Sequence, residues 1–318
     1  MHRYIIRRLL ISIPMLIGIT LIIFTLANLI PGDPMTAMMS EEAPMSGEAM
    51  EQRRETLGLD QPLPVRYFLW VTEVLQGNLG FSFITYVPIG ETILDRIPQT
   101  LELMGISLLL SIIIGTFLGI VSALKQYEPI DYILTIFAFV GRSVPVFFVG
   151  MLLIYFFSLR LDLFPVAGMV TVGKPFNIWD NLWHLVLPCA SLSLLRISVF
   201  TRYARSSMLE VLASDYITTA RAKGVKEKLV ILKHGFRNAL IPILTVIGYN
   251  LRTLFSGAII IETVFQWPGM GQLFITAVHQ RDYPMIMGLS LVISSVVLIG
   301  NLLTDISYAF ADPRIKYE

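Results

Sequence analysis

The chain has 318 residues, of which 55% are hydrophobic and 15% are charged, with a net charge of +1 and a mean hydropathy of +0.70. A soluble domain carries about 25% charged residues, so a water-exposed surface of this size would lack charge, whereas a lipid-exposed surface would not. The near-neutral balance gives no reason to expect nucleic acid as a partner. The single cysteine, Cys189, excludes an internal disulfide and a multi-cysteine metal site.

Six apolar segments are long enough to cross a bilayer, whose core of about 30 Å needs roughly 20 apolar helical residues. They are Leu9–Ile30, Leu101–Leu124, Tyr132–Leu159, His184–Phe200, Ala239–Ile261 and Pro284–Tyr308, the fourth being the shortest. Only helices and closed barrels satisfy the backbone in lipid, and these runs are too long and too uniformly apolar for barrel strands. The sequence therefore predicts an all-α integral membrane protein with one transmembrane domain over residues 1–318.

The first segment could be a signal peptide, because Arg3, Arg7 and Arg8 precede it. Its apolar core exceeds the 7–15 residues of a signal peptide, however, and no small-x-small cleavage site follows. We therefore expect it to remain as a membrane span.

Orientation follows from the basic residues that flank the spans. With the N-terminal arginines inside, alternation also places residues 201–238 and the C-terminal tail in the cytoplasm. Residues 201–238 carry eight basic side chains, which are Arg202, Arg205, Arg221, Lys223, Lys226, Lys228, Lys233 and Arg237. The bias predicts a multi-pass protein with both termini cytoplasmic.

The segment 31–99 is too long for a simple connector and is expected to form a partly helical extracytoplasmic loop. Gly58 is placed to end a helix over Gly47–Leu57. Pro64 is placed to start a second helix that ends before Gly77.

The segment 201–238 predicts a short helix between two others. Ser207 and Glu210 have the spacing of a capping box, and Asp215 can cap a helix over Tyr216–Lys223. Gly224 supplies the left-handed residue that ends this helix. A third helix is expected to start near Lys226 and to lead into the fifth span.

This short helix would display Tyr216, Ile217 and Ala220 as a knob, with Arg221 and Lys223 in its last turn, where they suit the helix dipole. A knob of this kind can transmit rigid-body motion to a partner with a matching groove. From the residues alone, a solvated basic loop that only obeys the positive-inside rule remains an equal alternative.

The run DYITTARAKG, followed by HGFRNALIP, resembles the cytoplasmic EAA loop of ABC importer permeases, most closely those of the dipeptide and oligopeptide class. The N-terminal RYIIRRLLISIPMLIGITLIIFTLANLIPGDP, and further LGLDQPLPVRYFLW, GNLGFS, SVPVFFVG, ETVFQWPGMGQL and DISYAFADPRI, are similar to that class in order and spacing. The resemblance departs at Thr218, Thr219 and Ala220, where the acidic residue of the general pattern is missing.

The resemblance implies a non-catalytic permease of a bacterial inner membrane that forms a translocation path for peptides with a sister permease, identical or different. Two ATPase subunits, which would hold ATP and magnesium, and an extracytoplasmic binding protein are implied as partners; this chain would bind no cofactor. The residues that match the coupling region are Asp215, Tyr216, Ile217, Ala220, Arg221, Lys223 and Gly224. The same class also serves nickel complexes and oligosaccharides, so these cargoes stay open.

Charged and polar residues within the spans are the candidates for a translocation path. A central arginine is costly in lipid, so Arg142 and Arg252, joined by Asn250, are expected to face protein or a water-filled path. A helix–helix polar contact is the alternative for each.

Two other function classes have less support in the sequence. An ion-coupled secondary transporter would place carboxylates mid-span, whereas Glu102, Glu262 and Asp305 lie near the span ends. An enzyme is opposed by the absence of HExxH, CxxC and GxSxG motifs and by scattered histidines. The Walker-like Gly168–Lys174 is followed by Pro175, where a phosphate loop needs Ser or Thr. No catalytic or metal-binding residues are therefore expected.

Overall fold

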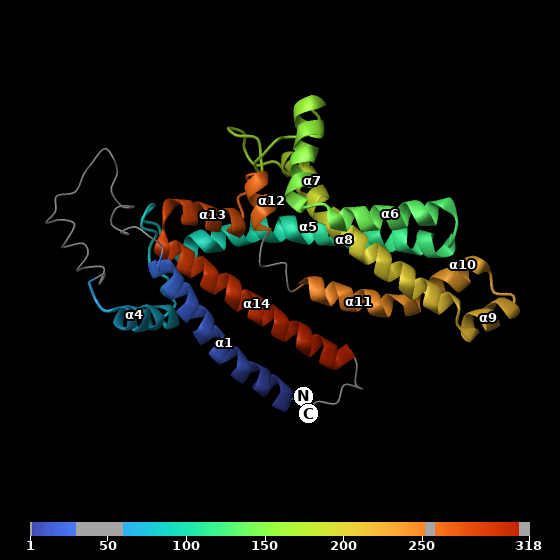
Figure 1. Ribbon diagram of the computed structural model, residues 1–318, viewed down its shortest axis with the longest axis horizontal. Coiled ribbons are helices and arrows are strands. Elements are labelled where there is room, and N and C mark those ends of the chain that lie inside the picture. The colour runs from blue at the N-terminus through green and yellow to red at the C-terminus, as the bar shows by residue number, and fades with distance from the viewer. Residues whose placement is uncertain (1, 30–59, 252–257, 312–318) are drawn as a thin grey trace. The chain divides into compact units, whose positions relative to one another are not determined.

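The computed structural model describes residues 2–29, 60–251 and 258–311. In this part of the chain the only β structure is an isolated bridge between Phe81 and Pro88, and helices form the rest of the regular structure (Figure 1). The all-α prediction is confirmed. Four helices in the described ranges are long and apolar enough to cross a membrane, and six spans result if two bent helix pairs each count as one.

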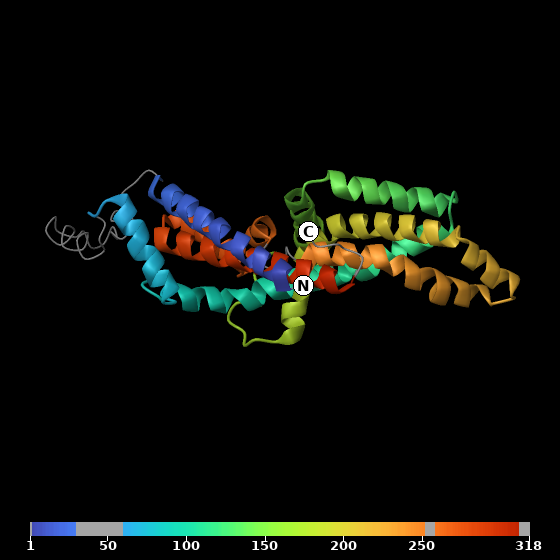
Figure 2. The ribbon, with the colours of Figure 1, turned by 90° about the horizontal axis from the view of Figure 1, so that it is seen from below.

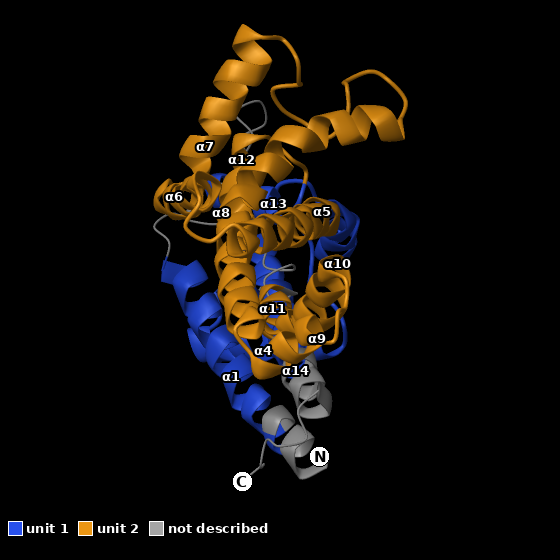
Figure 3. Ribbon diagram, turned by 90° about the vertical axis from the view of Figure 1, so that its right-hand side faces the viewer, with its two compact units in different colours: residues 1–99, 269–318 blue, residues 100–268 orange. Residues whose placement is uncertain are grey.

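The chain divides into two compact units (Figure 3), one of residues 1–99 and 269–318 and the other of residues 100–268. Helix α5 (Ile89–Leu124) contributes to both, because the boundary falls within it.

In the first unit, α1 (His2–Leu29) packs along α14 (Tyr283–Ala311), as Figures 1 and 2 show. These helices match the predicted first and sixth spans. Helix α4 (Leu63–Leu75) is followed by Gly77 with a φ of +84°, which confirms the predicted loop helix. The predicted helix Gly47–Leu57 lies outside the described residues.

The first unit also holds α13 (Met270–Gln280), which the sequence did not predict; it ends where Arg281 adopts a φ of +56°. Asp282 follows and is buried. Its carboxylate accepts hydrogen bonds from the Ser82 hydroxyl and, at 3.2 Å, from the Phe83 amide. This contact ties the loop before α5 to the start of α14.

In the second unit, α8 (Ile178–Leu212) lies between α6 (Pro129–Ser143) and α11 (Arg237–Leu251), as Figure 2 shows. Asn177 caps α8 by accepting a hydrogen bond from the Trp179 amide at 2.9 Å. The fourth span was predicted to be the shortest, and this was wrong: α8 has 35 residues, because its helix runs beyond the apolar core at both ends.

The third predicted span is broken rather than continuous. α6 ends before Val144, and the next helix, α7 (Val146–Leu153), runs on into a π-helical segment, η1 (Ile154–Arg160). The bend of 105° lies between α6 and this second helix. Val144 is extended, with φ −89° and ψ 129°, because the following Pro145 disfavours the helical conformation in the residue before it.

The fifth predicted span, Ala239–Ile261, is also interrupted. α11 ends at Leu251, residues 252–257 lie outside the described part, and α12 (Ile259–Val264) is a separate helix. Glu262 in α12 is fully buried, and its carboxylate accepts a hydrogen bond from the Thr100 hydroxyl at 3.1 Å.

Helices α5 and α8 approach each other closely through small residues. A Cβ on Gly115 would lie 2.6 Å from Cβ of Phe200, and one on Gly119 would lie 2.5 Å from the Thr201 carbonyl oxygen. This small-xxx-small spacing allows two membrane helices to pack backbone against backbone.

Candidate coupling site

The predicted short helix is present as α9 (Asp215–Ala222). Gly224 follows it with a φ of +74°, and its amide donates to the Arg221 carbonyl at 2.9 Å. The left-handed glycine is therefore confirmed as the element that ends α9. Figure 1 shows α9 directly after the far end of α8.

The predicted caps were wrong in two places. Ser207 and Glu210 lie inside α8, because the helix continues without a break to Leu212. Ser214, rather than Asp215, occupies the N-cap position, and its hydroxyl donates to the Val211 carbonyl at 2.5 Å instead of capping α9. Asp215 is the first helical residue, where a carboxylate still suits the helix dipole.

The expectation that α9 displays Ile217 and Ala220 was wrong. Ile217 is fully buried and Ala220 is 8% exposed. Both pack against Val230, with Val211, Leu212 and Val225 around them. Since residues i and i+3 share one face of a helix, this face anchors α9 to the end of α8 and to the returning chain.

The opposite side of α9 is the exposed one. It comprises Asp215, Tyr216, Thr218, Thr219, Arg221, Ala222 and Lys223. Tyr216 is 43% exposed, and its hydroxyl oxygen accepts a hydrogen bond from the Asn238 amide at 3.1 Å. The exposed face is thus mostly polar, with one aromatic ring.

Arg221 ties α9 to α10 (Glu227–Leu229). Its Nη2 and Nε donate to the Glu227 carboxylate at 2.7 and 3.2 Å. This hydrogen bond raises the pKa of Arg221, so the guanidinium stays charged. A segment of π-helix, η2 (Val230–Phe236), then leads into α11. The predicted third helix near Lys226 is confirmed as α10.

A buried polar network links α8 to the turn between α5 and α6. Asp131 is 3% exposed and accepts hydrogen bonds from Nε and Nη2 of Arg205 at 2.7 and 2.8 Å. The Ser122 hydroxyl and the Tyr127 amide donate to the same carboxylate. The sequence reading missed this pair, because 74 residues separate its members.

Arg196 was also missed, although an arginine inside the apolar run of α8 is a signal for a functional or packed polar residue. It is half-buried, and its Nη1 donates to the Ser107 hydroxyl of α5 at 3.1 Å. Two further serines contact Ser107. The Ser193 hydroxyl donates to the Ser107 carbonyl at 3.0 Å, and the Ser111 hydroxyl donates to the same carbonyl at 2.6 Å.

The three residues predicted to line a translocation path, Arg142, Asn250 and Arg252, lie in different parts of the chain. Arg142 is the last residue but one of α6, just before the break. Asn250 is half-buried in α11, and its amide donates to the Val246 carbonyl at 2.8 Å. Arg252 lies outside the described residues. A path-lining role for these residues stays a prediction.

Within the described ranges, no group of three or more His, Cys, Asp or Glu side chains is placed to hold a metal ion. The described residues form a multi-pass helical membrane protein. Its small helix α9 is attached to the end of α8 through a buried apolar cluster.

Comparison with known sequences identifies the family. Residues 115–317 match the family described as binding-protein-dependent transport system inner membrane component, and residues 1–104 match the N-terminal family of the same transport-system membrane components. The chain belongs to the family of binding-protein-dependent transport system inner membrane components.

Several curated relatives match over their full length. The oligopeptide transport system permease protein AppB of Bacillus subtilis is 44% identical over 318 residues, covering all of both chains. A putative peptide permease of Brucella suis is 47% identical over 99% of both chains. The dipeptide transport system permease protein DppB of Escherichia coli is 37% identical, again covering all of both chains.

A solved structure shares the fold. The crystal structure of an amino acid ABC transporter with histidines aligns with a TM-score of 0.50 and 16% identity, covering 68% of this chain and 92% of that one. The multi-pass inner-membrane nature of the chain follows from its family and its spans.

Proposed function

We propose that the chain is the permease subunit of an ATP-driven importer of peptides. Support comes from full-length relatives that are named as oligopeptide and dipeptide permeases, at identities of 37–47%. An ion-coupled mechanism has no such support, and peptides are favoured over nickel complexes and oligosaccharides as cargo.

The proposal includes partners. A sister permease completes the translocation path, two ATPase subunits hold ATP and magnesium, and an extracytoplasmic binding protein delivers the peptide. Both termini lie in the cytoplasm, which places α9 on the side where ATP is available. The basic residues of segment 201–238 favour this orientation.

The observation that carries the coupling role is the anchoring of α9. Buried Ile217 and Ala220 fix the helix to α8, so a push on α9 moves the end of a membrane span instead of bending a loop. The exposed face, with Tyr216 and Lys223, is the surface that an ATPase groove would contact. The contact residues are therefore proposed to be these exposed ones.

Growth on a peptide tests this function. A strain that lacks the chain and requires leucine is supplied with a leucine-containing dipeptide, and growth on free leucine serves as the reference. The complete chain should restore growth on the dipeptide, and Lys223→Glu should lower the uptake rate about ten-fold, as expected for an interface hot spot.

Lys228→Glu is the matched control, because Lys228 is also an exposed lysine but lies on α10, whereas Lys223 directly follows the last residue of α9. It should transport like the unaltered chain. Undiminished dipeptide uptake without the chain would contradict peptide import, whereas equal transport by both variants would contradict only the coupling role of the exposed face.

A further inference from the structure

Helices α6 and α8 pack against each other, and two of their contacts flank a cavity. At one point a Cβ on Gly141 would lie 2.5 Å from the Ser198 hydroxyl oxygen. At the other, Arg205 holds Asp131. Between these contacts lies a cavity of about 580 Å³, lined by residues of both helices.

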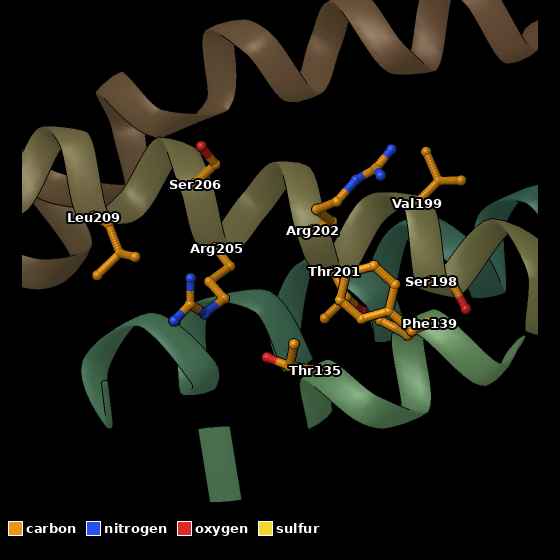
Figure 4. Close-up of a pocket in the computed structure, with 10 residues that line it drawn as sticks. Thr135, Phe139, Ser198, Val199, Thr201, Arg202, Arg205, Ser206 and Leu209 are labelled. Atoms are coloured by element: carbon orange, nitrogen blue, oxygen red, sulfur yellow. The ribbon is translucent and has the colours of Figure 1, made fainter. Parts of the chain in front are cut away.

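The walls of the cavity are amphiphilic (Figure 4). Phe139, Val199 and Leu209 provide apolar surface, whereas Ser198, Thr201 and Ser206 provide hydroxyls. Figure 4 shows Thr135 and Phe139 of α6 below α8, whereas the Arg202 and Ser206 side chains point upward from the other edge of α8.

Two polar groups of this cavity lack the partners that their chemistry favours. Thr201 is 2% exposed, and its hydroxyl has no hydrogen-bond partner among the described residues. A buried unsatisfied hydroxyl costs free energy. Arg202 pairs with no carboxylate in the described part of the chain, and its guanidinium lies 5.7 Å from the centre of the Tyr203 ring. The Thr201 hydroxyl is closed off from a ligand, whereas the exposed Arg202 guanidinium is open to one with anionic oxygens.

The position of these groups along α8 indicates the kind of anion. The apolar run of α8 ends near Phe200, and Arg202 and Ser206 follow within two turns. They therefore lie at the depth where a membrane span meets the lipid headgroups. Basic pockets between membrane helices at this depth bind anionic headgroups.

We propose that the cavity between α6 and α8 binds one anionic phospholipid, with its phosphate at Arg202 and the neighbouring hydroxyls and an acyl chain along Phe139 and Val199. A free anion would leave the apolar walls uncovered, which favours a lipid. The exposed apolar side chains of α6, including Ile133 and Ile136, continue the apolar surface towards the hydrocarbon.

Native mass spectrometry of the purified full-length chain tests the site. The chain is saturated with phosphatidylglycerol or with phosphatidylcholine of the same acyl composition, and the retained lipid is counted. Phosphatidylglycerol should be retained more tightly, and Arg202→Gln should weaken its retention about five-fold, the effect of one basic residue at the headgroup level. Equal retention of the two lipids would overturn the proposal.

Two further variants separate charge from shape. Arg237→Gln removes an exposed arginine outside the cavity and should retain phosphatidylglycerol like the unaltered chain. Ala138→Phe fills the cavity without altering charge and should also lose the lipid. Unchanged retention in both Arg202→Gln and Ala138→Phe would contradict the site.

Competition experiments distinguish a bound phospholipid from a free phosphate compound and from a peptide. Neither glycerol phosphate nor a dipeptide in excess should displace phosphatidylglycerol. Displacement by glycerol phosphate would identify a phosphate site, and displacement by the dipeptide would assign the cavity to the peptide path. Either result would refute the lipid assignment while leaving peptide import untouched.

Discussion

Arg205 of α8 holds Asp131 of α6 through two parallel hydrogen bonds, from Nε at 2.7 Å and from Nη2 at 2.8 Å. The carboxylate is buried and also accepts from Ser122 on α5. Three membrane helices of the second unit therefore meet at one ion pair, three turns before α9 begins. Two-point contacts of this kind fix orientation as well as distance, so the pair keeps the end of α8 in register with α5 and α6.

Asp131→Asn should lower the free energy of unfolding. Removing one partner leaves a guanidinium uncompensated; the full cost for a buried pair is about 3–5 kcal/mol. Arg205 keeps 28% of its side chain exposed, so we expect about 1–3 kcal/mol after solvent screening. Titration of the reconstituted chain with SDS measures this loss.

The control for that measurement is Glu128→Gln, one helical turn away. Glu128 pairs with Lys125 at 3.1 Å, but both side chains are about half exposed, at 54% and 53%. Such surface pairs contribute about 0–1 kcal/mol, so this variant should unfold almost like the unaltered chain. If Glu128→Gln lowered the free energy of unfolding as much as Asp131→Asn does, the Arg205–Asp131 pair would stabilise the chain no more than a surface pair.

Gly119→Ala should destabilise the packing of α5 on α8. The added Cβ would lie 2.5 Å from the Thr201 carbonyl oxygen and 2.6 Å from Cβ of Ala204, so the backbones must move apart. Overpacking of this kind costs about 1–3 kcal/mol. The melting temperature in detergent should fall accordingly.

Gly105→Ala, in the same helix, provides the comparison. A Cβ at Gly105 meets nothing within 4 Å, and alanine favours a helix over glycine by about 1 kcal/mol. This variant should be neutral or slightly more stable. If both alanine variants melted alike, the close approach of α5 and α8 at Gly119 would be refuted.

Labelling of single cysteines tests the proposed orientation. Cys189 is 2% exposed, so its replacement by alanine gives a cysteine-free background with little change at the surface. Lys226→Cys, next to α10, should react with a membrane-impermeant maleimide only after the cytoplasmic side is opened. Val172→Cys, in the loop between η1 and α8 and 97% exposed, should react in intact cells. The reverse pattern would invert the topology.

The elements that the sequence predicted well are those with local causes. Hydropathy alone located the first, second and sixth spans, and Gly224 located the end of α9, because lipid depth and a left-handed turn act on neighbouring residues. Pro145 also carried a local signal, the restriction of Val144, but the apolar run around it hid the break.

The features that were missed depend on tertiary contacts. Ile217 is buried by Val230, 13 residues later, and by the end of α8. The spacing of Ser207 and Glu210 suggested a cap, but packing on α11 and η2 lets α8 continue through them. Asp131 and Arg205 meet only once α6 has folded back on α8.

The conformation of Gly224 offers the sharpest test of the coupling role. Valine cannot adopt a φ of +74° without strain of at least about 1–2 kcal/mol, whereas asparagine tolerates it. A Cβ there meets no neighbour within 4 Å, so the backbone conformation alone separates the two variants. Gly224→Val should therefore tilt α9, and Gly224→Asn should preserve it.

Ala220→Asp provides a second route to the same defect. Ala220 is 8% exposed in the cluster with Ile217 and Val230, and a carboxylate there would be buried without a partner. The variant should stay inserted and abundant, because the cluster lies outside the spans, but α9 should detach from α8. Membrane abundance is measured by immunoblotting beside transport.

The most direct test of the central claim is the ATPase activity of the importer assembled in proteoliposomes, with and without peptide-loaded binding protein. The unaltered chain and Gly224→Asn should give stimulated hydrolysis and peptide uptake. Gly224→Val and Ala220→Asp should assemble to normal levels but lose stimulation and uptake together. Wild-type stimulation in both of these variants would contradict transmission through α9.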